Sequence, residues 1–508
     1  LYASLNNLSE TLSQKNKTKQ IPSLSFSSPN GKIEKIILTV FEDYLKKQDK
    51  EIIFPRNINH RINFDAILPE GFDTISGKVG VELKIYRNNT QIIRIYDIIG
   101  RILVNSDNID VLLLVLVTEV SECTKQKIYR ETAHLNFKIL IWDINDVVDM
   151  CRENESFFFE TYTNINNILL NDTVTTGLHR DSANYKQKRD EYVNQLSQEY
   201  SKDNIVLFLG AGASFDAGIS TWDNLISKLF VALLEEKFRG NGVNISFDKK
   251  DRIVEKLMEQ NSGSQLLQTR FIRSGFENRF TDIVSDILYE NSHSTSSLIN
   301  EICQLCISKR GKIGVQAVIN YNFDDLIERN LERLRVKYRS IYAEGMIPDN
   351  EEVGIYHVHG FLPKDKQIYK DLEKSLLVFS EEGYHKLFLE PYNWANMIQL
   401  NYLINNTCIF IGLSMTDPNL RRLLEISAQK SVDIEKRAKH YAILKRMEFK
   451  ENENFGRDDK IVKFEKIYEV LQESLFAELG LNIIWIDNFS EIPNLLKKIK
   501  ENKFFNGE

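Results

Sequence analysis

The strongest hydrophobic pattern in the chain lies just after residue 204. Residues 205–209 form a continuous apolar run of the kind that fills a buried parallel strand, and the run stops at a glycine turn, 210–212. Leucines at 225, 229 and 233 then recur at four-residue spacing, which is typical of the buried face of a helix. The pattern predicts a strand, a tight turn and a helix that opens at Ala213 and Ser214.

The two glycines of this turn, Gly210 and Gly212, allow the backbone to turn tightly and to approach a pyrophosphate. The free N–H groups and the dipole at the start of the following helix favour phosphate. This order of elements suggests a nucleotide site, and a glycine turn required only by geometry is the alternative.

A second pattern predicts an α/β domain at residues 31–150, after a polar, flexible segment at residues 1–30. Apolar residues between 33 and 45 share one helical face, and two strand-like runs between 61 and 88 are joined by a turn. A helix at 91–103 and strands at 111–117 and 138–142 complete this domain. Residues 151–200 are polar and are interpreted as a connector.

Residues 201–508 are predicted to form the second domain. A helical insertion is expected at about 240–312, where Ile253, Leu257, Leu266 and Leu267 are candidate core positions. Strands near 441–444 and 483–487 and a closing helix near 493–500 complete a doubly wound parallel sheet. The predicted fold class is therefore α/β.

Three polar side chains interrupt the apolar runs of the first domain. Asp65 ends the first strand-like run, and Glu82 and Lys84 share one face of the second because side chains alternate along a strand. Two carboxylates beside a cation indicate a metal site with Asp65 and Glu82 as ligands. A solvated strand edge is the alternative.

Composition narrows the functional classes. The chain has 508 residues, 42% of them hydrophobic, which is enough for two or three domains, and its net charge of −7 argues against nonspecific coating of nucleic acid. No apolar run is long enough to span a membrane, and the polar start has no signal-peptide core. Five scattered cysteines and a lone Cys303-x-x-Cys306 pair predict neither disulfides nor a zinc site, so we expect a cytoplasmic location.

Four ordered blocks in the second domain carry a family resemblance. GAGAS with GISTW, NYNFD at 320–324, a His-Gly at 359–360 and GLS at 412–414 resemble the blocks with which the sirtuin fold wraps NAD. The resemblance implies a sirtuin-type Rossmann-like domain in which the insertion covers the NAD pocket. It implies as NAD-binding residues Gly210, Ala211, Gly212, Ser214, Thr221, Trp222, Asp324, Gly412 and Ser414.

Two residues of these blocks are candidates for catalysis. An amide such as Asn322 can donate and accept at once to the ribose or to a water, and His359 titrates close enough to neutrality to serve as general base. The alternatives are that Asn322 and Asp324 cap the following helix. His357 is expected to be packed or partnered.

The chain also departs from the sirtuin pattern. Asn320 replaces the usual Thr and Ser220 the usual Pro, and no cysteine-bearing zinc module follows His359. Because that module shapes the acyl-lysine groove, its absence disfavours a protein deacylase. The segment after His359 is similar to sirtuin-like effectors of bacterial anti-phage defence, which hydrolyse NAD.

The first domain resembles the PD-(D/E)xK nuclease fold, also called restriction-endonuclease-like. On that resemblance Asp65 and Glu82 hold Mg²⁺ and Lys84 orients a water or steadies the transition state. Such a domain cuts DNA or only binds it.

Two hypotheses of different classes stay open: an NAD-hydrolysing effector with a nuclease-type domain, and a non-catalytic NAD sensor that controls the first domain. A deacylase is third. An amphipathic face within residues 446–478 suits either internal packing or a homo-oligomer contact. The resemblance to defence effectors also implies a HerA-type ATPase as a partner.

Overall fold

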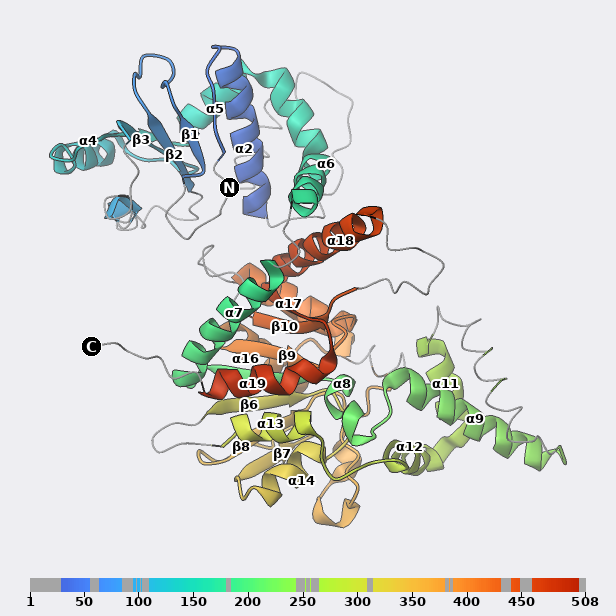
Figure 1. Cartoon of the computed structure of the whole chain (residues 1–508). Coiled ribbons are helices and arrows are strands. Elements are labelled where there is room, and N and C mark those ends of the chain that lie inside the picture. The colour runs from blue at the N-terminus through green and yellow to red at the C-terminus, as the bar shows by residue number, and fades with distance from the viewer. Residues whose placement is uncertain are drawn as a thin grey trace. The chain divides into compact units, whose positions relative to one another are not determined.

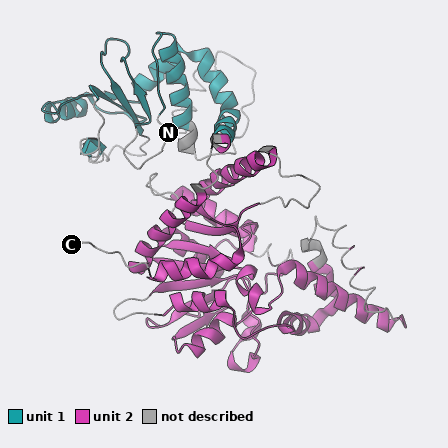
Figure 2. Ribbon diagram, in the orientation of Figure 1, with its two compact units in different colours: residues 1–175 teal, residues 176–508 magenta. Residues whose placement is uncertain are grey.

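The computed structural model describes residues 29–54, 64–84, 95–96, 98–100, 102, 109–179, 184–243, 252, 256, 265–307, 314–379, 383, 387–430, 440–447 and 459–501. The chain divides into two compact units, residues 1–175 and 176–508 (Figure 2). The boundary falls inside the predicted connector. Nearly all of the predicted flexible segment 1–30 and much of the predicted helix 91–103 lie outside the described residues, as do the side chains of the four candidate core positions in the insertion.

Unit 1 is built on a four-stranded sheet of order β1-β2-β3-β4. The strands are β1 (Ala66–Leu68), β2 (Val79–Lys84), β3 (Val111–Leu116) and β4 (Lys138–Trp142). β1 pairs with β2 in the antiparallel sense and the other pairs are parallel. The described helices are α2 (Pro29–Lys46), α4 (Glu122–Glu131), α5 (Ile144–Glu153) and α6 (Glu155–His179).

Both faces of this sheet are buried. Val111, Leu113 and Val115 of β3 join the core shared with α2, α5 and α6, while the alternate residues of β3 join a second core with α4. A strand covered on both faces reads as a continuous apolar run, which is why β3 was predictable from its sequence.

The predicted connector is helical where the structure describes it. Phe158 and Ile165 of α6 belong to the core of unit 1, and Val193 and Leu196 of α7 (Asn184–Ser201) belong to a core of unit 2. The segment is polar on average because its apolar residues are widely spaced, yet these residues lie on the buried faces of its helices.

Unit 2 contains a seven-stranded sheet of order β11-β10-β9-β5-β6-β8-β7, in which every pair is parallel (Figure 1). Its strands are β5 (Ile205–Leu209), β6 (Val315–Asn320), β7 (Tyr338–Ile341), β8 (Val353–His357), β9 (Thr407–Ile411), β10 (His440–Lys445) and β11 (Leu481–Ile486). The predictions of a parallel sheet and of strands at 441–444 and 483–487 are confirmed.

Helices cover both faces of the sheet of unit 2. Ile205, Leu207 and Leu209 of β5 pack into a core with α7 and α19 (Ile492–Glu501), and Val206 and Phe208 pack on the opposite side with α16 (Trp394–Asn405) and α17 (Pro418–Lys430). The predicted closing helix corresponds to α19. The other described helices are α8 (Ala211–Ser214), α9 (Trp222–Gly240), α11 (Gln265–Phe276), α12 (Phe280–Tyr289), α13 (Ser297–Leu305), α14 (Leu326–Arg333) and α18 (Asp459–Glu478).

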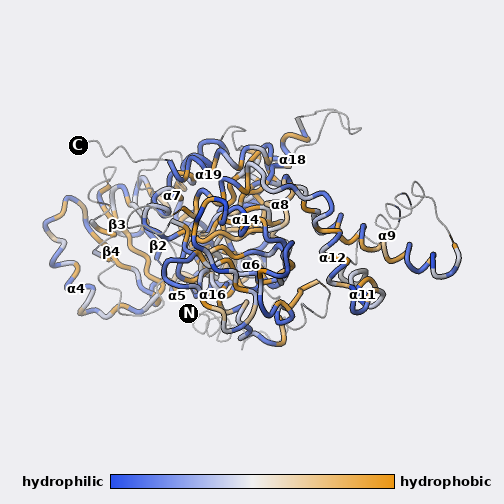
Figure 3. Tube along the Cα trace, turned by 90° about the horizontal axis from the view of Figure 1, so that it is seen from below, coloured by the Kyte–Doolittle hydropathy of each residue, from blue (hydrophilic) through white to orange (hydrophobic). Residues whose placement is uncertain are grey.

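Three of these helices form a separate group beside the sheet. α9, α11 and α12 contact one another, and they lie together in both views of the molecule (Figures 1 and 3). The tube of α9 alternates between apolar and polar colours in Figure 3, as expected of an amphipathic helix. α11 and α12 lie within the predicted insertion at about 240–312, whereas α9 ends where that insertion was expected to begin. None of the helices described in either unit is long and apolar enough to span a membrane.

Candidate active site

Two glycine turns meet at the carboxyl edge of the sheet in unit 2. Gly210 follows β5 and Gly412 follows the neighbouring β9, where the strand order reverses. The N–H of Gly210 donates to the carbonyl of Ile411, and that of Gly212 donates to the carbonyl of Gly412, both at 3.0 Å. In open parallel sheets, ligands bind at such a reversal of strand order.

Both turns need glycine because their backbones touch. Gly412 has a positive φ of 69°, and a Cβ there would lie 2.2 Å from the backbone nitrogen of Ala213. A Cβ at Gly212 would lie 2.9 Å from the Cα of Gly412. The predicted glycines of both blocks are therefore used to bring two distant chain segments together.

The predicted single helix after the turn is wrong. The chain forms the four-residue α8 and a short 3-10 turn, then takes a left-handed conformation at Gly218 (φ 80°) before α9 begins at Trp222. A side chain at Gly218 would meet the carbonyl oxygen of Asn291 at 2.0 Å, so a continuous helix cannot pass here. Leu225, Leu229 and Leu233 are buried on α9, as predicted, but α8 is too short for a helix-dipole argument.

A cavity adjoins the two turns. Its volume of about 560 Å³ is within the usual size range of ligand sites. All the site residues predicted for this unit line it except Gly212 and Ser214. Those that line it are Gly210, Ala211, Thr221, Trp222, Asn322, Asp324, His359, Gly412 and Ser414. Segments separated by more than 200 residues thus meet around one space.

The charge of the cavity lining is acidic. Asp223, Asp324 and Asp417 line it, and the described lining residues include no lysine or arginine. Such a lining favours a ligand with a positive centre over one whose charge is only negative.

Asn322 is held at every polar group except one. Its side-chain nitrogen donates to the carbonyl of Gly210 at 3.0 Å and to the hydroxyl of Ser214 at 3.1 Å. Because a backbone carbonyl can only accept, the orientation of the amide is fixed, and both of its hydrogens are engaged. The prediction that Asn322 donates and accepts at once is therefore wrong in this structure, since only its Oδ1 is left to accept a hydrogen bond from a ligand.

His359 is buried at the cavity wall, and its exposed fraction is 8%. The ring of Tyr321 meets the imidazole edge-on with 4.4 Å between centroids, and Oδ2 of Asp417 lies 3.7 Å from Nε2. Burial lowers the pKa of His359 below its ordinary value, and the opposing effect of Asp417 is smaller. The imidazole is therefore neutral at pH 7 and can accept a proton.

Asp324 combines the two predicted roles. Its Oδ1 accepts from the N–H of Leu326 at 3.0 Å, next to the start of α14, and the residue also lines the cavity. Burial raises the pKa of this carboxyl to about 6, against the lowering effects of the Leu326 amide and the Ser214 hydroxyl. Ser214 itself is buried behind Asn322 and does not line the cavity.

Sequence reasoning missed the two lining residues that approach the ring of His359, Tyr321 and Asp417. Tyr321 lies inside the NYNFD block at 320–324, but a tyrosine beside an asparagine gives no signal that it will pack on a histidine 38 positions later. Asp417 is an N-cap of α17, because its Oδ1 accepts from the N–H of Leu420 at 2.7 Å. The Asp-Pro-Asn sequence could have revealed the cap, although not its approach to His359.

The three predicted residues of unit 1 also come together. Lys84 pairs with Glu82 at 2.8 Å, and the N–H of Leu83 donates to Asp65 at 2.7 Å. Asp65 stands at the start of β1, and the prediction that it ends a strand is wrong. It is still adjacent to Glu82, because β1 runs antiparallel to β2 and pairs Ala66 with Val81.

A fourth ionisable residue, Glu34 of α2, belongs to this group and was missed. Its pKa is raised to about 7, chiefly by burial and also by the charges of Asp65 and Glu82, against the lowering effect of Lys84. Burial likewise raises the pKa of Asp65, more than Lys84 and the Leu83 amide lower it. A metal-holding group of three or more acidic, histidine or cysteine side chains does not occur among the described residues, so the carboxylates of unit 1 do not fit a metal site as they stand.

Comparisons with known proteins address mainly unit 2. Residues 316–467 match the family model of the SIR2-like domain. The chain is 23% identical over 317 residues to "NAD(+) hydrolase ThsA" of Enterococcus faecium, covering 61% of this chain and 58% of that protein. It is 22% identical over 320 residues to the protein of the same name in Bacillus cereus (strain MSX-D12), covering 61% and 57%. It is also 22% identical over 328 residues to the protein of that name in Acinetobacter baumannii (strain 532279), covering 62% of this chain and 57% of that protein. The matches thus span a little over half the length of these relatives.

Proposed function

We propose that this protein hydrolyses NAD⁺ to nicotinamide and ADP-ribose in the cavity of unit 2. The observation that carries the proposal is a neutral, buried His359 that lines the same cavity as Asn322 and the two glycine turns. The matched SIR2-like domain and the name "NAD(+) hydrolase" of the relatives support it.

The glycine turns and the acidic lining suit different parts of NAD⁺. At Gly210 and Gly412 the backbone carries no side chains, so a pyrophosphate can approach the two turns closely. Asp324 and the other carboxylates of the lining stabilise the positive nicotinamide ring and the oxocarbenium-like ribose that forms as the bond breaks. The remaining predicted contacts, from Ala211, Thr221, Trp222 and Ser414, enclose the substrate.

The reaction needs one base and one hydrogen-bond acceptor. The bond between the ribose C1′ and the nicotinamide nitrogen breaks, and the nicotinamide leaves with the electron pair. A water oxygen forms the new bond to C1′, and His359 takes the proton that this water loses. Oδ1 of Asn322 accepts a hydrogen bond from the water or from a ribose hydroxyl and so fixes the direction of attack.

The test is the release of free nicotinamide from NAD⁺ by the wild type and three variants. Loss of a positioned acid or base typically lowers the rate by about 10²–10⁴-fold, which is the effect expected for His359→Ala and Asn322→Ala. His293 is an exposed histidine of the same unit outside the cavity, so His293→Ala is the matched control. Full activity of both cavity variants would overturn the proposal. NAD⁺ binding without any release of nicotinamide would favour a non-catalytic sensor, and release that depends on an acylated peptide would favour a deacylase.

As a second proposal, unit 1 acts on DNA, either by cutting it with Mg²⁺ or by binding it. What supports this is the convergence of Asp65, Glu82 and Lys84, with Glu34 beside them. Carboxylate oxygens are the ligands that Mg²⁺ prefers, but because the described groups do not form a metal site, we assign no reaction step to a metal.

Cleavage and binding of plasmid and single-stranded DNA, with and without Mg²⁺, separate these activities. Metal-dependent cutting that vanishes in Glu82→Ala would support a nuclease, and DNA binding without cutting would support a binding domain. Cutting that persists in Glu82→Ala would place the activity elsewhere. Neither cutting nor binding would leave unit 1 as a scaffold.

We further propose that the protein is a cytoplasmic anti-phage effector whose NADase activity is restrained until it assembles. Phe464 and Leu475 of α18 are 53% and 41% exposed, and they lie on the amphipathic face predicted for a contact between copies. A HerA-type ATPase is a second candidate partner. Light scattering beside the nicotinamide assay tests this proposal, with Leu471→Asp as the disrupting variant. A wild type that is monomeric and fully active at all dilutions without a partner would overturn it.

A further inference from the structure

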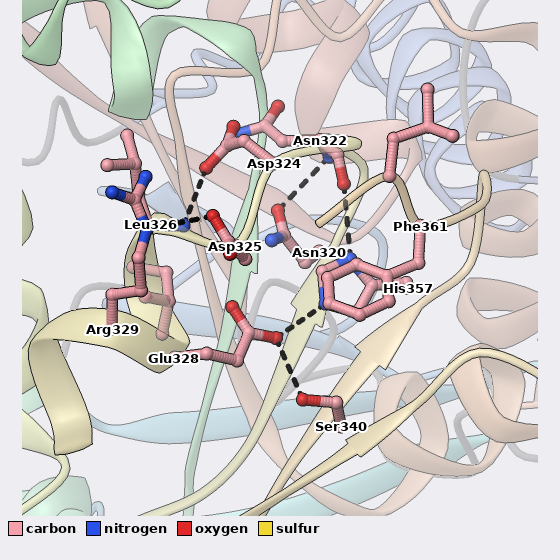
Figure 4. Close-up of polar contacts among 12 residues, drawn as sticks. Asn320, Asn322, Asp324, Asp325, Leu326, Glu328, Arg329, Ser340, His357 and Phe361 are labelled. Carbon is pink, nitrogen blue, oxygen red and sulfur yellow. Dashed lines mark hydrogen bonds and ion pairs between the residues drawn. The ribbon is translucent and has the colours of Figure 1, made fainter. Parts of the chain in front are cut away.

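A buried ionisable pair lies directly behind Asn322. Nε2 of His357, at the end of β8, is 2.6 Å from Oε1 of Glu328 on α14, and both side chains are fully buried. On the other side of the ring, Nδ1 of His357 is 3.2 Å from the backbone carbonyl oxygen of Asn322 (Figure 4). His357 is thus partnered, as predicted, but neither partner was foreseen.

The hydrogen-bond partners of His357 determine where the hydrogen atoms of this pair lie. The carbonyl of Asn322 can only accept, so Nδ1 of His357 carries a hydrogen and donates it. Nε2 faces a carboxylate, and the shared proton between them belongs either to the imidazole or to Glu328. In both cases the ring is held from both sides, and Phe361 packs against it with 4.0 Å between ring centroids.

The pair is also held from the side of α14 and the sheet. The hydroxyl of Ser340 on β7 donates to the same oxygen of Glu328 at 3.2 Å (Figure 4). Glu328 is therefore oriented by two separate strands, β7 through Ser340 and β8 through His357.

Stability alone is a poor explanation for such a pair. Two ionisable groups lose their hydration when they are buried, and apolar residues of similar volume often serve the fold equally well. The pair ends on Asn322, whose other polar groups apart from Oδ1 are also held by the protein. The N–H of Asn322 donates to Asn320 at 3.1 Å, and its side-chain hydrogens are taken by Gly210 and Ser214.

We propose that His357 and Glu328 are positioning residues that hold the backbone of Asn322 so that its Oδ1 points at the reacting ribose. The inference rests on the proposed hydrolysis of NAD⁺ and adds a hydrogen-bonded chain from α14 to the reacting atoms. Neither residue lines the cavity, so neither is a catalytic residue.

Two substitutions of His357 separate positioning from stability. In an asparagine the amide nitrogen replaces Nδ1, and in a glutamine it replaces Nε2. His357→Asn therefore keeps the donor to the Asn322 carbonyl and leaves Glu328 without its partner, whereas His357→Gln keeps the contact with Glu328 and loses the donor. Positioning predicts that His357→Asn retains the higher kcat, while the thermal midpoint is higher for His357→Gln.

The kinetic difference expected is large enough to measure. A misplacement of about 1 Å at a reacting centre lowers kcat by up to about 10²-fold, so His357→Gln should lose roughly 10–10²-fold in kcat with little change in KM. A purely structural pair would make activity per folded molecule follow the thermal midpoint, with His357→Gln the more active. That order, or equal kcat in both variants, would overturn the inference.

A second pair of variants tests Glu328 independently. Glu328→Gln can still donate an N–H to Nε2 of a neutral His357 and should restore most of the kcat lost in Glu328→Ala. Ser340→Ala is the control, because it removes a partner of Glu328 without touching His357. Failure of Glu328→Gln to exceed Glu328→Ala would contradict the hydrogen-bonded chain.

The proposed function and the positioning role fail in different ways. No release of nicotinamide by the wild type would contradict the proposed hydrolysis, and the positioning role would fall with it because it rests on that reaction. If the wild type is active and the two His357 variants are equally active, the positioning role alone is contradicted.

Discussion

Each unit gathers ionisable side chains in a partly desolvated place, and the group in unit 2 also lines a cavity. His359 and Asp324 line a space of about 560 Å³, and burial lowers the pKa of His359 and raises that of Asp324 to about 6. In unit 1, Glu34 has a pKa raised to about 7 by burial, while Glu82 is paired with Lys84.

This difference shows what a shifted pKa can establish. Burial next to like charges is enough to raise a carboxyl pKa, and ion-pair networks do so without any substrate. The cavity and the bare glycine turns supply the independent evidence in unit 2. In unit 1 the pKa of Glu34 is raised by burial and by the charges of Asp65 and Glu82, and neither cause requires a substrate.

The sharpest test of the comparison measures NAD⁺ hydrolysis in one variant of each unit. His359→Ala should lower NAD⁺ hydrolysis by about 10²–10⁴-fold because it removes the base. Glu82→Ala should leave NAD⁺ hydrolysis unchanged, since its side chain belongs to the other unit. The measurement is nicotinamide release at matched concentrations of folded protein.

The control for that experiment is thermal unfolding, which must show that both variants remain folded. A loss of NAD⁺ hydrolysis in Glu82→Ala as large as that in His359→Ala would mean that the two groups do not act separately. The comparison would then have to be abandoned.

Much of unit 2 was predictable because parallel strands bring their carboxyl ends to one edge. The apolar run at 205–209 identified β5, and the blocks at 322, 359 and 412 follow β6, β8 and β9 in the chain, so a common site could be expected. The break at Gly218 was not predictable from the leucine spacing, because it depends on a close approach to Asn291.

Contacts between side chains far apart in sequence account for the rest. Glu328 and His357 are 29 residues apart, and nothing in either sequence block specifies that they pair. Glu34 precedes Asp65 by 31 positions on a helix whose apolar face alone was informative. Asn322 was identified correctly as a candidate, yet which of its atoms remained available depended on Gly210, 112 positions away.

Asp324→Asn tests whether the acid of the cavity is kept at the expense of stability. The pKa of Asp324 is about 6 in the folded protein against an ordinary value of 3.8. This difference means that the ionised carboxylate lowers the free energy of unfolding by about 3 kcal/mol. Because the pKa is raised, this cost is absent below about pH 4, grows between pH 4 and 6, and is complete above. Asparagine keeps the acceptor for Leu326, so the variant should unfold at higher denaturant concentration than wild type at pH 8 and equally at pH 4.

The same variant should be less active in NAD⁺ hydrolysis, since it loses a carboxylate that faces the cavity. Higher stability together with lower activity would mark Asp324 as a functional acid. Lower stability at pH 8 would show that its charge is compensated in the fold and would contradict the raised pKa.

A smaller effect is expected from Asp417→Asn on the pH dependence of hydrolysis. The reaction needs neutral His359, so kcat should fall on the acid side as pH drops through the lowered pKa of this histidine. Asp417 raises that pKa, so its removal should move the acid limb to still lower pH. Asp223→Asn is the control, because Asp223 lines the same cavity without affecting the pKa of His359. Equal shifts in both variants would point to the overall charge of the cavity instead of the contact at 3.7 Å.

The smallest effect is expected from Glu34→Gln, the counterpart of Asp324→Asn in unit 1. Its folded pKa of about 7 lies above the ordinary 4.5, so ionisation at high pH costs stability and the gain on substitution should open between pH 4.5 and 7. The gain should be smaller than that of Asp324→Asn, because Glu34 is only partly buried and water screens its charge. Amide exchange in β3 measures the stability of unit 1 at pH 8 and pH 4.5, and nicotinamide release should stay at the wild-type level. If Glu34→Gln instead loosens β3 at pH 8, a partner stabilises the ionised carboxylate in the folded protein, and the raised pKa of Glu34 would be contradicted.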